Sequence, residues 1–463
     1  MLDWIAHHLS IFLFAALAIF LFSGYPVAFV LGGIAIFFGV IGIALDVFEP
    51  IQFYNLISRL YGSVAANPIV VAVPMFIFMG TMLERSGVAN ALLQALQVLT
   101  RRVPGGLAMS VTLMGTIMAA TTGIVAASVV MLTLVALPAM LARGYQKELM
   151  VGTIAAAGTL GILIPPSIML VLMGDLLSVS VGTLFAAAVL PGLALSGMYL
   201  LYIGAVSAVR PAWAPPLPAD IGPKSHAELW RMLLKSFFPP AFLITLVLGS
   251  IFGGWATPTE AAGVGSLGAI LLAWMNRRLN MQTVREVIQS AGLTNALVFF
   301  IFFGATLFSY VFRSLGGDDV VTEILKAIGI DTPWEIMAFL MVLVFLLGFF
   351  FDWIEICLIV LPIFTPVLRD VDFSAHLGQS GSMVFMIWFI ITIAINLQTS
   401  FLTPPFGFTL FYMRGTVPPS VTMGHIYRGI APFVMLQLVG LALALAFPSL
   451  VLWLPRAAGL LNF

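Results

Sequence analysis

The chain has 463 residues, of which 61% are hydrophobic and only 8% are charged, and its formal net charge is zero. A soluble chain carries about 25% charged residues, so this chain lacks the polar shells that several soluble domains would need. Its apolar residues occur in runs of about 17 to 25, the length that crosses a bilayer as a helix. The composition therefore predicts an all-α polytopic protein of the lipid bilayer and excludes a soluble globular one.

The counts of particular residues narrow the class further. The basic residues are scattered over a neutral chain, which argues against a nucleic-acid partner. With a single cysteine, Cys357, and five histidines near span ends or in loops, no metal cluster built from these residues and no organic cofactor is expected. The 27 Pro and 42 Gly favour helices with breaks over a β-barrel. The first ten residues lack the basic region of a cleaved signal peptide, so the first apolar run is expected to be a retained helix.

In chain order, the apolar segments form two successions of the same kind. The first consists of single spans at 9–22, 26–44 and 64–82, two arms at 105–120 and 124–141, a span at 150–173 interrupted by Pro165-Pro166, and a span at 181–208. A proline-rich stretch at 210–235 follows. The second consists of single spans at 240–252, 260–275 and 293–312, two arms at 334–350 and 353–368, a span at 383–413 interrupted by Pro404-Pro405, and a span at 430–454.

This order predicts two repeats. They are residues 1–208, with a hairpin at 104–141 and a broken helix at 150–174, and residues 238–463, with a hairpin at 333–369 and a broken helix at 383–413, joined by a cytoplasmic linker at 209–237. Hydropathy alone makes any two membrane halves look alike, but matched Pro-Pro pairs in matched order are harder to obtain by chance. The other matched markers are Gly80 and Gly304, Pro104 and Pro333, and Pro138 and Pro362. Amphipathic stretches at 88–99 and 320–328, before each hairpin, are expected to lie at the interface.

The placement of charge predicts the topology. If each two-armed unit is a re-entrant hairpin, each half makes five net crossings, so the second half is inserted upside down relative to the first. Fourteen of the 19 basic residues then fall on one side, and the other side keeps only Arg59, Arg313, Lys326, Arg369 and Arg456. The positive-inside rule makes the basic side cytoplasmic and places both termini in the periplasm. If either hairpin spanned the membrane instead, this segregation would collapse.

The consecutive prolines point to ion or substrate sites. Proline lacks an N–H group and disfavours helical geometry in the residue before it, so each Pro-Pro pair frees carbonyls upstream. Unwound carbonyls at the bilayer midplane are cation ligands, and the N-termini of half-helices attract anions. The freed carbonyls belong to Gly161, Ile162, Ser400 and Phe401, and the neighbouring hydroxyls to Thr159, Ser167, Thr399, Ser400 and Thr403. The alternative at either break is a purely structural kink.

The tips of the two hairpins carry the other candidate ligands. The first tip, AATTG at 119–123, places two hydroxyls and a flexible glycine between apolar arms, which is typical of a turn whose backbone approaches an ion. The second tip, GFFFDWIE at 348–355, places Asp352 and Glu355 in apolar surroundings, where a carboxylate is expensive and points to function. The alternatives are that Asp352 caps the second arm and that Glu355 lies near a water-filled cavity without a role.

Three further polar residues lie deep in apolar runs. Gln398 and Asn396 come just before the second break and either face a ligand or bond to a neighbouring helix. Glu260 follows Thr257-Pro258-Thr259, a sequence that starts a helix well, so a capping role is favoured for it.

The missing motifs indicate the energy source. None of the four lysines follows a glycine, so the chain has no phosphate-binding loop and does not itself hydrolyse a nucleotide. It also has no HExxH zinc motif, no paired acidic motif for prenyl transfer and no TVGYG-like potassium filter. What remains is a secondary transporter driven by an ion gradient, and no enzymatic activity is expected.

Several longer segments carry a resemblance to a known family. The chain resembles the large membrane subunit of the tripartite ATP-independent periplasmic (TRAP) transporters over essentially its whole length. The matching pieces are VPMFIFMGTMLERSG (73–87), PAMLARGY (138–145), GTLGILIPPSI (158–168), ATPTEAA (256–262), FDWIEICLIVLPIFTP (351–366) and NLQTSFLTPPFG (396–407). The resemblance implies an elevator-type sodium symporter of the bacterial inner membrane that takes up organic acid anions. It also implies a four-helix small membrane subunit and a periplasmic substrate-binding protein as partners.

The resemblance also nominates site residues. The sodium ligands it implies are Thr121, Thr122, Gly123, Gly161, Ile164 and Pro165 for one ion, and Gly348, Asp352, Ser400, Thr403 and Pro404 for the other. The substrate-binding candidates are Pro166, Ser167, Gln398 and Pro405. Many members have Gly-Ser-Ser at the first tip and a glycine in place of Ser400, so the individual ligands stay open. No membrane segment precedes the first span, so the small subunit is expected to be a separate chain.

The substrate itself cannot be read from the sequence. No arginine falls near the two breaks to mark a dicarboxylate. A proton-coupled transporter or an exporter of the same fold stays open as an alternative, with a channel or a membrane-embedded enzyme further behind.

Overall fold

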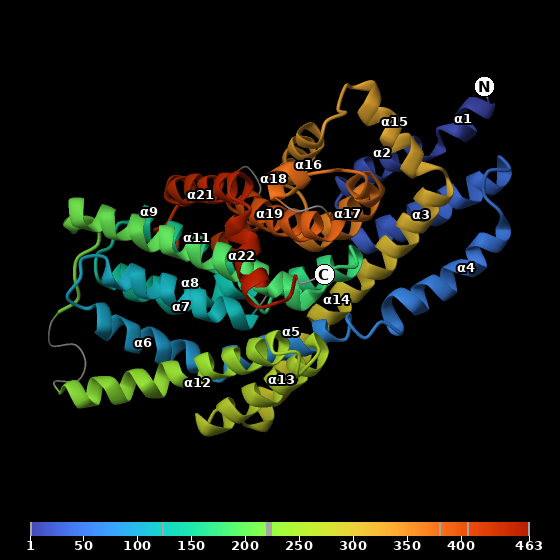
Figure 1. Cartoon of the computed structure of the whole chain (residues 1–463). Coiled ribbons are helices and arrows are strands. Elements are labelled where there is room, and N and C mark those ends of the chain that lie inside the picture. The colour runs from blue at the N-terminus through green and yellow to red at the C-terminus, as the bar shows by residue number, and fades with distance from the viewer. Residues whose placement is uncertain (1, 123–124, 219–224, 379–380, 405–406, 462–463) are drawn as a thin grey trace.

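The structure is a computed structural model that describes residues 2–122, 125–218, 225–378, 381–404 and 407–461. Within these ranges every regular element is a helix (Figure 1). Seven of the described helices are long and apolar enough to cross a membrane. These observations confirm the prediction of an all-α polytopic membrane protein.

The first half runs from α1 to α11. Its elements are α1 (Leu2–His7), α2 (Leu9–Leu21), α3 (Val27–Ala44), α4 (Pro50–Leu60), the π-helical turn η1 (Tyr61–Ala65), α5 (Ala72–Arg85), α6 (Val88–Thr100), α7 (Gly106–Thr122), α8 (Val125–Ala142), α9 (Lys147–Thr159), the 3-10 turn η2 (Leu160–Ile162), α10 (Ile168–Leu176) and α11 (Val181–Val209). The arms of the first predicted hairpin are α7 and α8, and the first broken span is the series α9, η2 and α10.

The second half repeats this order. Its elements are the 3-10 turn η3 (Pro211–Trp213), α12 (His226–Phe252), α13 (Pro258–Met275), α14 (Met281–Ser314), α15 (Gly317–Ala327), α16 (Pro333–Leu347), α17 (Trp353–Arg369), α18 (Ser374–Leu377), α19 (Ser382–Leu402), α20 (Phe408–Arg414), α21 (Met423–Ala446) and α22 (Ser449–Ala457). The second hairpin is the pair α16 and α17, and the second broken span is α19 followed by α20.

Several boundaries differ from the sequence expectation. The span expected at 64–82 is α-helical only from Ala72, as α5, after the turn η1, and the span expected at 293–312 begins earlier, at Met281, as α14. Helix α12 begins at His226, inside the stretch read as a linker, because the prolines of that stretch end at Pro223 and the charged residues beyond it are compatible with a helix. The last span is divided into α21 and α22, because Pro448 cannot continue the hydrogen-bond ladder of α21.

The motif Thr-Pro-x-Glu starts two of the helices. Thr257 precedes α13 and Thr332 precedes α16, each with proline at the first helical position. The Thr257 hydroxyl accepts from the Glu260 backbone N–H at 3.3 Å, and the Glu260 carboxylate accepts from the Thr257 N–H at 2.8 Å. This reciprocal pair is a capping box, which satisfies two N–H groups that the helix leaves unpaired. The predicted capping role of Glu260 is confirmed, and its exposed side chain corrects the expectation that this acid lies deep.

Helices of the first half pack against helices of the second half in equivalent pairs. Helix α3 packs along α14, and α13 packs along α5, the equivalents of that pair in the other half (Figure 1). In the same way α2 contacts α15 while α12 contacts α6, and α10 contacts α17 while α20 contacts α8. Helices α6 and α15, which precede the two hairpins, each follow a glycine with positive φ, Gly87 at 78° and Gly316 at 75°. Two interlocked copies of one arrangement account for all of these pairs.

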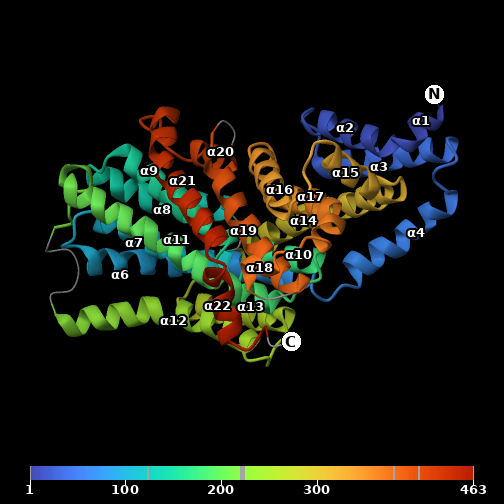
Figure 2. The same ribbon diagram turned by 45° about the horizontal axis from the view of Figure 1, so that its top comes forward.

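The two broken spans are closely packed against neighbouring helices. Helix α19 lies near the middle of the molecule in both views (Figures 1 and 2), and every residue from Val384 to Leu402 is buried. Helix α9 packs against α21 where a Cβ on Gly152 would lie 2.1 Å from the Gly429 carbonyl oxygen. Small residues at helix crossings are how membrane helices approach closely. The two broken spans therefore sit in a tightly packed core.

Candidate ion and substrate site

The first break is closed by a serine. Ser167 precedes α10, and its hydroxyl donates to the Ile162 carbonyl, one of the two that Pro165-Pro166 leaves without a helical partner, at 2.5 Å. The same oxygen accepts from the Leu170 N–H at 3.5 Å. All residues from Gly161 to Leu170 are buried. Ser167 thus stabilises the break. Its hydroxyl oxygen has one lone pair left after these two bonds, so a contact with substrate would use that lone pair.

The second break is lined by hydroxyls that bond backward. Within and just after α19, the hydroxyls of Thr399, Ser400 and Thr403 donate to the carbonyls of Ile395, Leu397 and Thr399 at 3.0, 2.8 and 2.8 Å. Each hydroxyl hydrogen is therefore committed to the helix, while the oxygen keeps lone pairs for another partner. An oxygen with committed hydrogen and free lone pairs suits a cation, so the chemistry of these residues fits the sodium ligands nominated for Ser400 and Thr403.

The second hairpin touches this break through a glycine. Gly348 ends α16, and a Cβ built on it would lie 2.0 Å from the Ser400 hydroxyl oxygen. Only glycine fits at this distance, because any side chain would occupy the position of the hydroxyl. The structure therefore brings together two predicted ligands that lie 52 residues apart in the sequence.

The two acids of the second tip form the start of α17. Asp352 is the N-cap, and its carboxylate accepts from the Trp353 N–H at 2.8 Å. The Glu355 carboxylate accepts from the Asp352 N–H at 3.3 Å. The capping alternative for Asp352 is thus realised in the structure. Among the described residues, neither acid has a lysine or arginine within 4 Å, so no basic side chain pairs with them.

The first tip is only partly described. Thr121 and Thr122 are the last residues of α7, and Gly123 lies outside the described residues, as does Pro405 at the second break. Helix α7 packs against η2, so the first hairpin arm and the first break are neighbours. Ile164 is buried with its side chain against the backbone position of Gly192, and Pro165 is buried beside it.

The two breaks meet through a pair of equivalent residues. The Gln398 amide donates to the Thr159 hydroxyl at 3.3 Å across a separation of 239 residues, the same offset that relates Pro165 to Pro404. Gln437 on α21 donates to the same hydroxyl at 3.5 Å. The side-chain carbonyl oxygens of both glutamines are buried and have no partner among the described residues. Gln437 was not found from the sequence, although a lone amide in an apolar span is the same signal that singled out Gln398.

Asn396 bonds to a neighbouring helix, which is the second of the two roles expected for it. Its amide donates to the Met341 carbonyl of α16 at 2.7 Å, and its side chain is buried. The bond fastens α19 to the first arm of the second hairpin.

Each break therefore lies between its own hairpin and the second arm of the other one. Helix α10 packs on α17, α20 packs on α8, and α19 contacts η2. Figure 2 shows α10 near α14 and α17, away from α7 and α8. Within the described residues, each broken helix thus contacts arms of both hairpins.

A family comparison identifies the kind of protein. The sequence model of the DctM component of tripartite ATP-independent periplasmic transporters matches residues 14–450. The chain belongs to this family. It is a TRAP large membrane subunit, a component of a transporter and not an enzyme.

Relatives in the TRAP family differ in what they carry. The chain is 28% identical over 420 residues to the C4-dicarboxylate TRAP transporter large permease protein DctM of Pseudomonas aeruginosa, covering 90% of each chain. It is 31% identical over 389 residues to the ectoine/5-hydroxyectoine large permease protein UehC of Ruegeria pomeroyi, covering 83% of this chain and 85% of the relative. It is 29% identical to the isethionate TRAP transporter permease protein DctMQ of Oleidesulfovibrio alaskensis, covering 95% of this chain and 65% of the relative.

A solved structure shares the fold of this TRAP subunit. The crystal structure of the YdaH transporter of Alcanivorax borkumensis, described as having an unusual topology, matches with a TM-score of 0.59 over 88% of this chain and 90% of that one. The sequence identity is 15%, so the likeness concerns the fold.

Proposed function

We propose that this subunit carries out sodium-coupled uptake of organic acid anions across the bacterial inner membrane. The observation that carries the proposal is the close approach of Gly348 to the Ser400 hydroxyl, four residues before Asp352, an acid with no lysine or arginine within 4 Å among the described residues. Oxygen ligands of this kind are the set that a hard cation such as sodium prefers. The substrate class is supported by relatives named for C4-dicarboxylates and isethionate.

The mechanism proposed is an elevator. The moving unit would contain both hairpins and both broken helices, which contact one another closely, while α2 to α6 and α12 to α15 would form the scaffold. The predicted division into residues 1–208, 209–237 and 238–463, with both termini in the periplasm, fits this assignment. A four-helix small membrane subunit and a periplasmic substrate-binding protein would complete the system.

Reconstitution tests the proposal. Vesicles that hold this chain, its small subunit and the cognate binding protein should accumulate the substrate of that binding protein only under an inward sodium gradient. A thermal-shift screen of organic acids on the binding protein would first identify that substrate. Uptake driven by a proton gradient without sodium would contradict sodium coupling.

Proton coupling is the second candidate, because Asp352 and Glu355 lie one turn apart in a largely apolar tip. In that case Asp352→Asn and Glu355→Gln would abolish proton-driven uptake, whereas Thr403→Ala would have no effect. Conductance without the binding protein would instead indicate a channel.

A further inference from the structure

A cavity of about 540 Å³ lies apart from the two breaks, between α14 and the hairpin arm α17. The other elements that line it are α4, η1 and the end of α10. Its volume falls within the range of about 300–1,000 Å³ that small-molecule sites occupy. Because α4 and α14 belong to the proposed scaffold and α10 and α17 to the proposed moving unit, the cavity spans the boundary between them.

One face of α14 presents polar groups to this cavity. Thr306, Ser309, Tyr310 and Arg313 recur at helical spacing on a helix that is otherwise largely apolar, and all four line the cavity. The Ser309 hydroxyl is buried and has no hydrogen-bond partner among the described residues. A buried hydroxyl without a partner is costly unless something else bonds to it.

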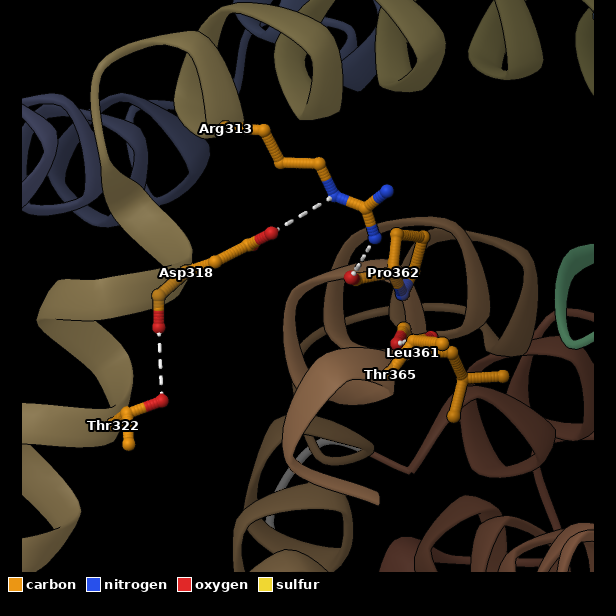
Figure 3. Close-up of polar contacts among 6 residues, drawn as sticks. All are labelled: Arg313, Asp318, Thr322, Leu361, Pro362 and Thr365. Atoms are coloured by element: carbon orange, nitrogen blue, oxygen red, sulfur yellow. Dashed lines mark hydrogen bonds and ion pairs between the residues drawn. The ribbon is translucent and has the colours of Figure 1, made fainter. Parts of the chain in front are cut away.

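Arg313 is held in place at the edge of the cavity. Its guanidinium donates to the Pro362 carbonyl at 2.5 Å, and its Nε lies 3.7 Å from the Asp318 carboxylate (Figure 3). The Pro362 carbonyl is available because Pro366, four residues on, has no N–H to give it. The head group of Arg313 is thereby fixed between scaffold and hairpin arm, with part of its charge balanced by Asp318.

Arg59 has no such partner. Its guanidinium carbon lies 5.4 Å from the centre of the Tyr310 ring, so the aromatic face positions it without neutralising it. No carboxylate of the described residues lies within 4 Å of it. The cavity's own acid, Asp175, instead accepts from the Asn67 amide at 2.7 Å. Arg59 is thus an exposed cation at the cavity wall that lies over the Tyr310 ring and has no carboxylate within 4 Å among the described residues.

We propose that this cavity binds a carboxylate group of the transported anion on its way to the broken helices, with Arg59 as counter-ion and Arg313 and Ser309 as further donors. A guanidinium suits this task because its planar N–H groups match the two oxygens of a carboxylate. The inference rests on the proposed uptake of organic acid anions and adds an outer site to it. The phosphate of an anionic lipid offers the same oxyanion chemistry, and the test below separates the two sources.

The test measures the electrostatic potential inside the cavity. Ser63→Cys places a thiol on the cavity wall in the full chain, and the native Cys357 is fully buried. The variant, in nanodiscs of phosphatidylcholine, is labelled with a sulfonate-bearing and with an ammonium-bearing methanethiosulfonate reagent. The ratio of the sulfonate rate to the ammonium rate should be about ten times the same ratio measured with a small free thiol in solution. Adding Arg59→Gln should remove most of this preference.

A matched control removes a charge elsewhere. Arg369 is exposed, lies outside the cavity and is predicted to be on the same side of the membrane, so Arg369→Gln should leave the preference unchanged. Equal rates of the two reagents, or a preference that Arg59→Gln does not alter, would overturn the proposal.

Competition identifies the source of the oxyanion. Acetate, succinate and citrate are added in phosphatidylcholine nanodiscs, and phosphatidylglycerol replaces the lipid in a separate arm. Slower labelling with at least one soluble carboxylate, lost in Arg59→Gln, supports the substrate route. If only phosphatidylglycerol slows the labelling, the cavity binds lipid, and the proposal of a site for the transported anion is overturned. Because labelling needs neither sodium nor uptake, its failure is distinguishable from a failure of sodium coupling in vesicles.

Discussion

The two hairpin-and-break units share a backbone plan and differ in chemistry. In the first unit the break is closed by Ser167, which donates to the freed Ile162 carbonyl. In the second unit the hydroxyls of Ser400 and Thr403 bond back into α19, a hairpin glycine packs against Ser400, and two acids start the second hairpin arm. The two units thus share the way the backbone is opened, by paired prolines, and differ in the side chains around the opening. Equivalent positions in such repeats need not have equivalent ligands.

The largest effect is expected where the second unit is most tightly packed. Gly348→Ala would place a methyl group at the position of the Ser400 hydroxyl and should destabilise the fold by about 1–3 kcal/mol and abolish uptake. Thermal unfolding in detergent and vesicle uptake measure the two effects. Gly197→Ala, on α11 with no atom within 4 Å of the new Cβ, is the control and should change neither. Normal uptake by Gly348→Ala would show that the hairpin does not rest on Ser400.

The second largest effect is expected on the sodium dependence of uptake, from the acid at the tip of the second hairpin. Asp352→Asn keeps the shape of the cap but removes its charge, so the sodium concentration for half-maximal uptake should rise about tenfold, which corresponds to about 1.4 kcal/mol. Thr403→Ala should shift it in the same direction. A sodium titration of uptake measures both, with Glu335→Gln, an exposed acid at the start of α16, as the control. Unchanged sodium activation in both variants would remove the proposed site from the second unit.

The bond between the units should contribute less. Gln398→Leu and Thr159→Val each remove one partner of the 3.3 Å bond and should each lower the free energy of unfolding by about 1 kcal/mol. The double variant should be less unstable than the sum of the two, because the lost bond is counted once. Thermal unfolding of the four proteins measures this coupling. Strict additivity would mean that the two breaks are not coupled at this point.

The starts of the two hairpins should show the smallest difference. The second begins with the Thr332 cap, whereas the first begins at Gly105, which has a positive φ of 77° and packs against Ser207. Thr332→Ala should destabilise the protein by about 1 kcal/mol. Thr257→Ala, which removes the same motif from α13, should act to the same extent in thermal unfolding. An effect of Thr332→Ala on sodium affinity as well would show that the cap shapes the tip.

Features that depend on local chain properties could be predicted from the sequence. The Pro-Pro breaks, the hairpin arms and the Thr-Pro-x-Glu starts each follow from neighbouring residues. The sequence assigns Gly348 and Ser400 to the same candidate site. It does not predict that they touch, because the distance between them depends on how the hairpin packs on α19. The cavity of Arg59, Arg313 and Ser309 was missed, since it is assembled from elements far apart in the chain whose register no local pattern reveals. The start of α12 is predicted wrongly from the sequence, because the prolines that precede a helix do not fix the residue at which it begins.

Equilibrium binding of radioactive sodium to the purified subunit pair tests the central claim most directly, because it needs no knowledge of the substrate. If both units bind an ion, the chain should take up two sodium ions, and Asp352→Asn should leave one at the same concentration. No saturable binding, or two ions bound with unchanged affinity in Asp352→Asn, would contradict the account of two unlike sodium sites built on one repeated backbone.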